Sequence, residues 1–149
     1  MVIQRIQTLF MLLAIGMLVA FMFVPYGYYD VMVDNVSQSL SLKGTMEEGL
    51  WEPAVVACVL LLTAIFMYKR LPLQKMMVLL SILITGAVIL TVIYTLVSGY
   101  SDETVTAVGG KTIWGGGGLL AVAALVAEIM ALRGVNSDQR LLNSYDKLR

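Results

Sequence analysis

The sequence has no histidine and only one cysteine, Cys58. Without histidine, no Ser-His-Asp or Cys-His arrangement can form, and a lone cysteine excludes a CxxC redox pair. Most zinc, haem and copper sites are excluded with them. Ten methionines offer soft sulfur ligands for Cu(I), but they are scattered without a paired spacing and suggest packing or lipid-facing positions. We therefore expect no enzyme, no metal site and no cofactor, with Cys58 packing as a small apolar residue.

The sequence also lacks an excess of either charge, with ten basic and ten acidic residues. Because nucleic-acid binding requires a basic surface, nucleic acid is not an expected partner. Apolar residues are abundant instead: they make up 59% of the chain. An average soluble protein has about 45–50%. A water-soluble domain therefore fits this composition poorly.

Four apolar runs approach the length of about 20 residues that a helix needs to cross a bilayer. They cover residues 6–25, 53–68, 76–97 and 112–132. Residues 1–149 are therefore expected to form a single transmembrane domain, an all-α membrane protein built as a four-helix bundle. It would have outer loops at 26–52 and 98–111 and a cytoplasmic tail at 133–149. The expected main partner is the lipid bilayer.

The distribution of basic residues predicts the orientation, because cytoplasmic ends of membrane helices are enriched in Lys and Arg. Only Lys43 and Lys111 lie in the outer loops. The other eight fall on one side of the predicted spans: Arg5, Lys69, Arg70, Lys75, Arg133, Arg140, Lys147 and Arg149. Aromatic residues at the predicted outer ends, such as Trp51 and Trp114, agree with this assignment. Both termini are therefore expected in the cytoplasm.

The first outer loop is long for a connection between adjacent helices, which suggests that it has structure of its own. Residues 29–34 and 39–43 alternate apolar with polar or charged side chains, which predicts two short strands around an Asp34-Asn35 turn. In the second outer loop, residues 103–108 are rich in β-branched side chains and would add a third strand. A small extracytoplasmic β-sheet or hairpin is expected.

The C-terminal tail shows a different pattern. Gly134 follows Arg133 and predicts a helix end, with a restart near Asn136 or Ser137. Leu141, Tyr145 and Leu148 then recur at helical spacing, which predicts a short C-terminal amphipathic helix on the inner leaflet. Arg140, Lys147 and Arg149 would complete a cytoplasmic basic face with Arg5, Lys69 and Arg70. An ordinary cytoplasmic tail is the alternative.

Glu128 is the only ionisable residue well inside a predicted span, and such acids are candidate functional sites. It continues a stripe of small residues at alternating spacings of four and three, formed by Gly117, Ala121, Ala124 and Ala131. Small residues let membrane helices approach closely, so Glu128 is expected to point into the bundle. Its candidate partners are Ser81 and Thr85 on the third helix, or Arg5 or Lys69. A structural hydrogen bond or ion pair and a role in proton or substrate handling both remain open.

Four consecutive glycines, residues 115–118, lie near the outer end of the fourth run. A phosphate-binding P-loop would continue with Lys and Ser or Thr, but Leu119 and Leu120 follow here. Close helix packing, or a locally unwound first turn, explains the run better.

Three short stretches resemble one family. They are Ile3-Gln4-Arg5-Ile6-Gln7-Thr8, then Tyr68-Lys69-Arg70 with Leu73-Gln74, and the terminal segment containing Arg140, Leu141, Ser144 and residues 146–149. The chain resembles domain of unknown function 4293, a family of uncharacterised four-helix inner-membrane proteins from Bacteroidetes. The resemblance implies a cell inner membrane with a periplasmic outer face, and it brings no known catalytic or binding residues.

Two functional hypotheses follow. The first is a non-enzymatic accessory or scaffold protein that presents a periplasmic sheet and a basic cytoplasmic helix to protein partners. The alternative is a small transporter or channel, working as a homo-oligomer, with Glu128 in its path. A polar cavity that reaches Glu128 from the cytoplasm would favour the alternative, and a dry, close-packed bundle would favour the scaffold.

Overall fold

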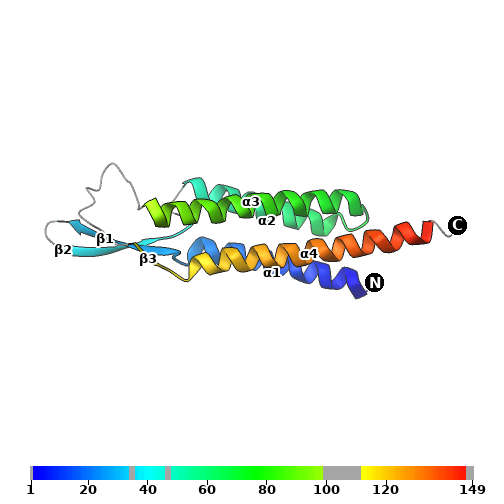
Figure 1. The fold of residues 1–149 in the computed structure, drawn as a ribbon, viewed down its shortest axis with the longest axis horizontal. Helices are drawn as coiled ribbons and strands as arrows, with labels where there is room; N and C mark the ends of the chain where they lie inside the picture. Colours follow the sequence, from blue (N-terminus) through cyan, green and yellow to red (C-terminus); the bar gives the residue numbers. More distant parts are fainter. Residues whose placement is uncertain (1, 34–35, 46–47, 99–111, 147–149) are drawn as a thin grey trace.

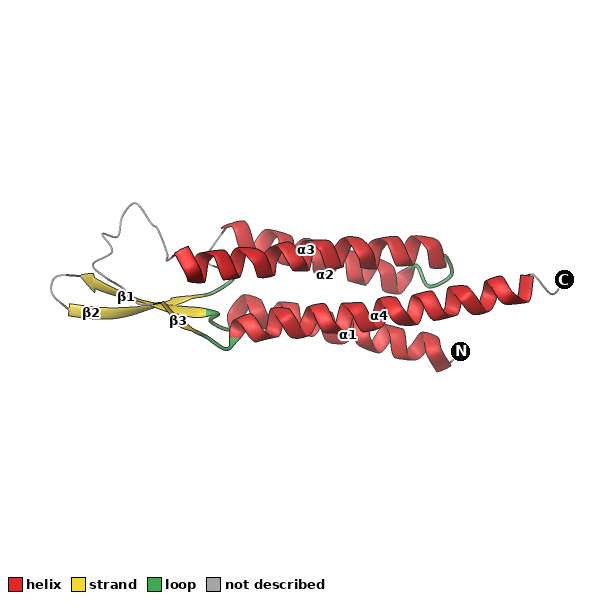
Figure 2. Ribbon diagram, in the orientation of Figure 1, coloured by secondary structure: helices red, strands yellow, loops and turns green. Residues whose placement is uncertain are grey.

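The computed structural model describes residues 2–33, 36–45, 48–98 and 112–146. They form helix α1 (Val2–Phe23), strands β1 (Gly27–Val33) and β2 (Val36–Leu42), helices α2 (Glu48–Phe66) and α3 (Leu71–Ser98), strand β3 (Thr112–Trp114) and helix α4 (Gly117–Asp146). The described chain is therefore mostly helical with a small sheet, as the sequence predicts (Figure 2).

The four helices lie side by side along the long axis of the molecule, and the sheet extends from one end (Figure 1). Helix α1 packs mainly against α4 and α2 against α3, while α3–α4 and α1–α2 contacts join the two pairs. Helix α1 begins, and α4 ends, at the end opposite the sheet (Figure 1). We call this the terminal end, and the other the sheet end.

Buried side chains recur along each helix with a heptad-like spacing of four and three residues. In α1 they are Gln7, Met11, Ala14, Leu18 and Phe21. In α4 the spacing runs through Gly117, Ala121, Ala124, Glu128, Ala131, Val135 and Asp138, and Ala127 is buried beside it. A mean spacing of 3.5 residues keeps one seam of each helix facing its neighbours, as in left-handed helical bundles. The stripe expected from Gly117 to Ala131 is therefore this buried seam, and it extends further than expected.

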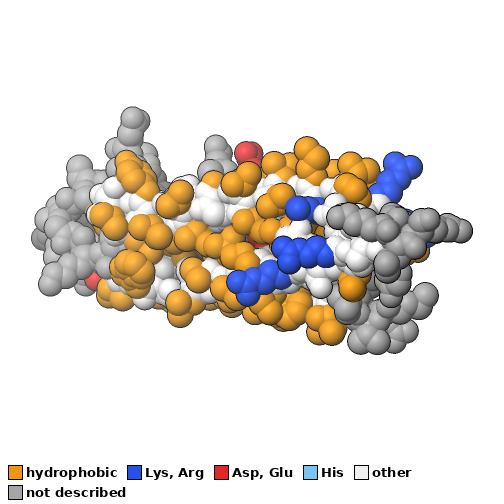
Figure 3. All heavy atoms as spheres, turned by 45° about the vertical axis from the view of Figure 1, so that its right-hand side comes forward, with side chains coloured by type: hydrophobic (Ala, Val, Ile, Leu, Met, Phe, Trp, Pro, Cys, Tyr) orange, Lys and Arg blue, Asp and Glu red, His pale blue; other side chains and the backbone are white. Residues whose placement is uncertain are grey.

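Many large apolar side chains lie on the outer faces of the helices. Leu83 is 71% exposed, Leu90 69% and Leu119 74%, and apolar side chains cover much of the visible face in Figure 3. The interior contains small residues and several polar ones, including Ser81, Thr85 and Glu128. An apolar exterior around an interior that includes small and polar residues is an arrangement that suits a lipid surrounding.

Three helices are long and apolar enough to cross a membrane, over Ile6–Phe23, Leu71–Ser98 and Gly117–Ser144. The apolar part of α2, Leu50–Phe66, is shorter. Helix α2 also starts earlier than the predicted run at 53–68, because Pro53 lies inside the helix instead of before it.

The predicted hairpin is confirmed. Strands β1 and β2 pair antiparallel from Gly27 opposite Leu42 to Val33 opposite Val36. The Asp34-Asn35 turn lies outside the described residues, as does the strand expected at 103–108. The third strand that the structure describes is β3, which pairs antiparallel with β1 so that the sheet order is β2-β1-β3.

Strand β3 corrects the predicted start of the fourth helix. Residues 112–114 were expected to begin a helical span, but they extend the sheet instead. The amide of Gly115 donates to the carbonyl of Tyr26 at 2.8 Å, and the amide of Gly117 donates to that of Pro25 at 2.9 Å. These bonds hold the chain against the α1–β1 connection, so α4 begins only at Gly117.

The predicted break at Gly134 is wrong, and so is the separate C-terminal amphipathic helix. Helix α4 runs without interruption from Gly117 to Asp146. Gly134 faces α1, where an added Cβ would lie 2.5 Å from Cγ of Gln7. The glycine therefore serves close packing within the helix, and the buried seam continues past it to Val135 and Asp138.

Candidate functional site

Glu128 is fully buried in α4, with no exposed surface. Its Oε1 accepts hydrogen bonds from Ser81 Oγ at 2.8 Å and from Thr85 Oγ1 at 2.9 Å. The structure thus confirms the predicted inward orientation and two of the predicted partners. The other candidate, Lys69, lies with its Nζ 5.8 Å from the centre of the Tyr68 ring instead. For Arg5 the structure describes the backbone in α1 but not the side chain.

The helical repeat explains this geometry. Ser81 and Thr85 are one turn apart on the buried seam of α3, so both hydroxyls reach the same carboxylate oxygen. Ala57 of α2 and Ala124 of α4 are fully buried nearby in the same core cluster. Small residues at these positions allow the helices to approach closely enough for the contact.

Helix α2 closes the other side of the site. Ser81 Oγ lies 3.5 Å from the carbonyl oxygen of Ala57, and the buried Cys58 is the next residue of α2. Ser81 therefore lies between the acid of α4 and the backbone of α2. Ala57 was not expected there, because helix order alone does not show which face of α2 meets α3.

The second oxygen of Glu128, Oε2, is buried and has no hydrogen-bond partner among the described residues. No basic side chain of the described segments forms an ion pair with this carboxylate. Arg70, Arg133 and Arg140 are exposed. The blue groups in Figure 3 accordingly lie at the surface, towards the terminal end of the molecule. The carboxyl group is thus held by hydroxyl groups alone.

A second buried polar contact was missed by the sequence analysis. Gln7 Nε2 of α1 donates to Asp138 Oδ2 of α4 at 2.6 Å, close to the terminal end. Gln74 of α3 is also buried. The four-and-three spacing of the small-residue stripe could have revealed Asp138, had it been extended through Gly134.

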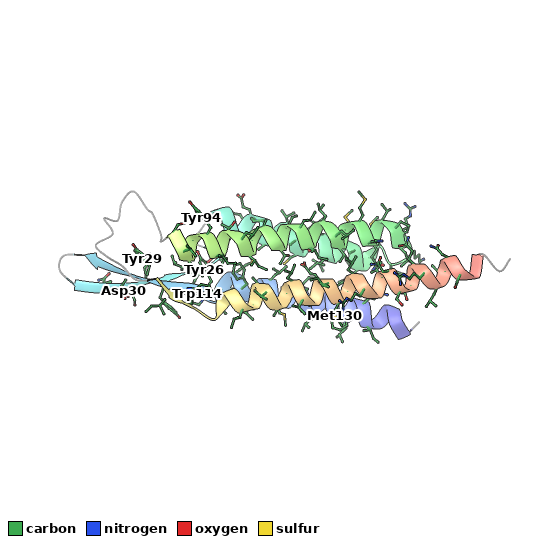
Figure 4. All side chains as sticks on the ribbon, viewed as in Figure 1. Tyr26, Tyr29, Asp30, Tyr94, Trp114 and Met130 are labelled. Carbon is green, nitrogen blue, oxygen red and sulfur yellow. The ribbon has the colours of Figure 1, made fainter. Side chains whose placement is uncertain are left out.

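The cavity found at the sheet end is apolar. Its volume is about 180 Å³, and it lies between α3 and α4 beside β3, lined by residues that include Tyr26, Val92, Leu96, Trp114 and Ala121. Figure 4 shows Tyr26 and Trp114 at this end of the helices. Ala121 is seven residues from Glu128, about 10 Å along the helix axis. The cavity therefore does not reach the buried acid.

The chemistry available at the site is limited. Within residues 2–33, 36–45, 48–98 and 112–146, no three His, Cys, Asp or Glu side chains gather as metal ligands would. One carboxyl group, two hydroxyls and a neighbouring thiol can hold a proton or a hydrogen-bonded group. They do not form a paired acid and base.

These features define a helical protein with an apolar exterior, a short sheet at one end and two buried polar contacts in its interior, one at Glu128 and one at Asp138. The family model for Domain of unknown function (DUF4293) matches residues 3–148, so the chain belongs to that family. No curated protein matches it.

Proposed function

We propose that this protein is a non-enzymatic scaffold of the cell inner membrane, which presents its sheet to protein partners on the periplasmic side. The observation that carries the proposal is the sheet itself. It projects beyond the helices at one end, and the side chains of Gln38, Ser39 and Leu40 on β2 are exposed. An exposed strand offers main-chain and side-chain groups to a partner.

The exposed leucines support a bilayer as the surrounding medium, since lipid removes the cost of leaving them in water. We expect helix α2 to cross the bilayer together with the other three helices, although its apolar part is shorter. It begins at the sheet end and is followed, within a short turn over residues 67–70, by α3 at the terminal end. Its 19 residues span about 28 Å, close to the thickness of a bilayer core.

The basic residues support the orientation. Lys69, Arg70, Arg133 and Arg140 belong to the terminal half of the molecule, far from the sheet. By the positive-inside rule that end would face the cytoplasm, with both termini. The sheet would then face the periplasm.

A pair of matched variants tests the scaffold role. Ser39 is exposed on β2 and Ser144 is exposed near the end of α4. Solubilised native membranes should yield the chain together with a defined protein in constant ratio. Ser39→Arg should weaken binding of that protein about tenfold, which corresponds to about 1.4 kcal/mol, and so lower the ratio, whereas Ser144→Arg should leave the ratio unchanged. Recovery of the intact chain alone, or equal loss in both variants, would refute the role.

A small oligomeric transporter or channel is the second candidate, and the buried Glu128 is the observation that favours it. Its acid would lie in the transport path, so Glu128→Gln would abolish proton-coupled flux into liposomes that contain the purified protein. A scaffold predicts no flux above that of empty liposomes for either form.

A further inference from the structure

We propose that Glu128 is a proton-binding site inside the helices, with an exchangeable proton on Oε2 and with Ser81 and Thr85 holding Oε1. This site goes beyond a scaffold role, because it concerns a ligand of the intramembrane layer and does not depend on what the sheet binds. Its ligand is a proton, which the carboxylate binds to form a neutral carboxylic acid.

The first argument is the balance of charge. An ionised carboxylate in an apolar interior needs a positive charge beside it. Helix α3 faces the acid with the uncharged hydroxyls of Ser81 and Thr85. The nearest contact of α2 with this group is the uncharged carbonyl of Ala57, 3.5 Å from Ser81 Oγ. The buried seam of α1 beyond Gln7 contributes only apolar residues, namely Met11, Ala14, Leu18 and Phe21. A bound proton is therefore the simplest neutralising ligand that the described residues allow.

The second argument is the unequal hydrogen bonding of the two carboxyl oxygens. Oε1 accepts both hydroxyl hydrogen bonds, which is the role of the carbonyl oxygen of a carboxylic acid. Oε2 accepts none and is buried. An ionised group would leave negative charge on an oxygen without a donor, whereas a neutral group has its hydroxyl there. The asymmetry thus fits a proton on Oε2.

The third argument concerns access. Asp138 lies ten residues from Glu128, about 15 Å along α4. Between them Ala131 and Val135 are fully buried, as is Val78 of α3. This apolar layer separates the acid from the terminal end. Exchange of the proton with water at the terminal end therefore requires this layer to open, so that proton occupancy and the packing of α3 and α4 are coupled.

Infrared spectroscopy of the purified full chain in lipid bilayers tests the proposal. The spectrum of the wild-type chain at neutral pH should contain the C=O stretch of a protonated carboxylic acid, and Glu128→Gln should remove it. Asp138→Asn is the matched control at the other buried acid, and should leave the band unchanged. Transfer to D₂O should shift the band to lower frequency.

Two further variants distinguish a proton site from a merely structural side chain. Ser81→Ala and Thr85→Val should each shift the band to higher frequency, because each removes one hydrogen bond to Oε1. A wild-type spectrum without the band, a band that Na⁺ removes, or a band that never shifts in D₂O would each overturn the proposal.

Discussion

Individual glycines in the run 115–118 have different roles. A Cβ on Gly117 would lie 2.5 Å from the carbonyl oxygen of Val24, whereas a Cβ on Gly116 would meet nothing within 4 Å. A Cβ on Gly115 would also be too close to backbone, 2.5 Å from the carbonyl oxygen of Pro25. A Cβ on Gly118 would make only an ordinary contact, 3.9 Å from Cγ1 of Val92. Only alternate glycines are therefore required for close packing, although all four look equivalent in the sequence.

This difference gives a prediction for two adjacent residues. Gly117→Ala should lower the free energy of unfolding by about 1–3 kcal/mol, because its obstacle is backbone and cannot rotate away. Gly116→Ala should change it by no more than about 0.5–1 kcal/mol, in the stabilising direction. Unfolding in detergent micelles measures both. Equal effects would show that the contact with Val24 and Pro25 is not made.

At Glu128 the predicted effect depends on the replacement. Glu128→Gln keeps the volume and an oxygen that accepts from Ser81 and Thr85, so stability should change by less than about 1.5 kcal/mol. Glu128→Ala leaves a cavity and two buried hydroxyls without their acceptor, and should cost about 2–5 kcal/mol. Thermal unfolding of the two variants in the same lipid or detergent compares them. A similar loss for both would mean that the hydroxyl contacts contribute little.

Among the elements, α4 shows how tertiary contacts override a local signal. Gly134 has the residue type and the position of a helix end, yet the helix continues for twelve more residues to Asp146. A glycine in a helix interior costs only about 1 kcal/mol relative to Ala. The burial of Val135 and Asp138, together with the bond from Gln7, offsets that cost.

A double substitution tests this explanation of α4. Gly134→Ala should destabilise the wild-type protein by about 1–2 kcal/mol, because its Cβ displaces Gln7. In a Gln7→Ala background, where that side chain is absent, the same change should stabilise by about 0.5–1 kcal/mol. Gly86→Ala in α3, where nothing lies within 4 Å, is the control and should stabilise in both backgrounds. Additive effects of Gln7→Ala and Gly134→Ala would contradict the contact.

For the whole molecule, the arrangement of its ends predicts which sites face the same side of a membrane. Cys58 is the only cysteine, so Cys58→Ala gives a background for labelling. In this background, Ser39→Cys should react with a membrane-impermeant maleimide from the periplasmic side. Ser144→Cys should react only after the membrane is opened. Labelling of both from the same side would exclude the proposed topology.

The sequence alone was enough for the coarse fold. The apolar runs, the alternating residues of the first loop and the spacing around Glu128 predicted helices, a hairpin and an inward-facing acid, and the structure has all three. These features are local, since each depends on residues within a few turns or one strand. The inward stripe also predicted Ser81 and Thr85 as partners, because their own spacing puts both on one face of α3.

Only the tertiary structure determined the features that depend on contacts between residues distant in sequence. Strand β3 forms because residues 112–114 meet β1, and α4 passes Gly134 because Gln7 of α1 packs there. Likewise, the contact of Ser81 with Ala57 and the isolation of Glu128 Oε2 follow from the packing of three helices. Periodicity shows which face of a helix is buried. Only the packed helices show which residues that face contacts, because small residues can pack closely against several different neighbours.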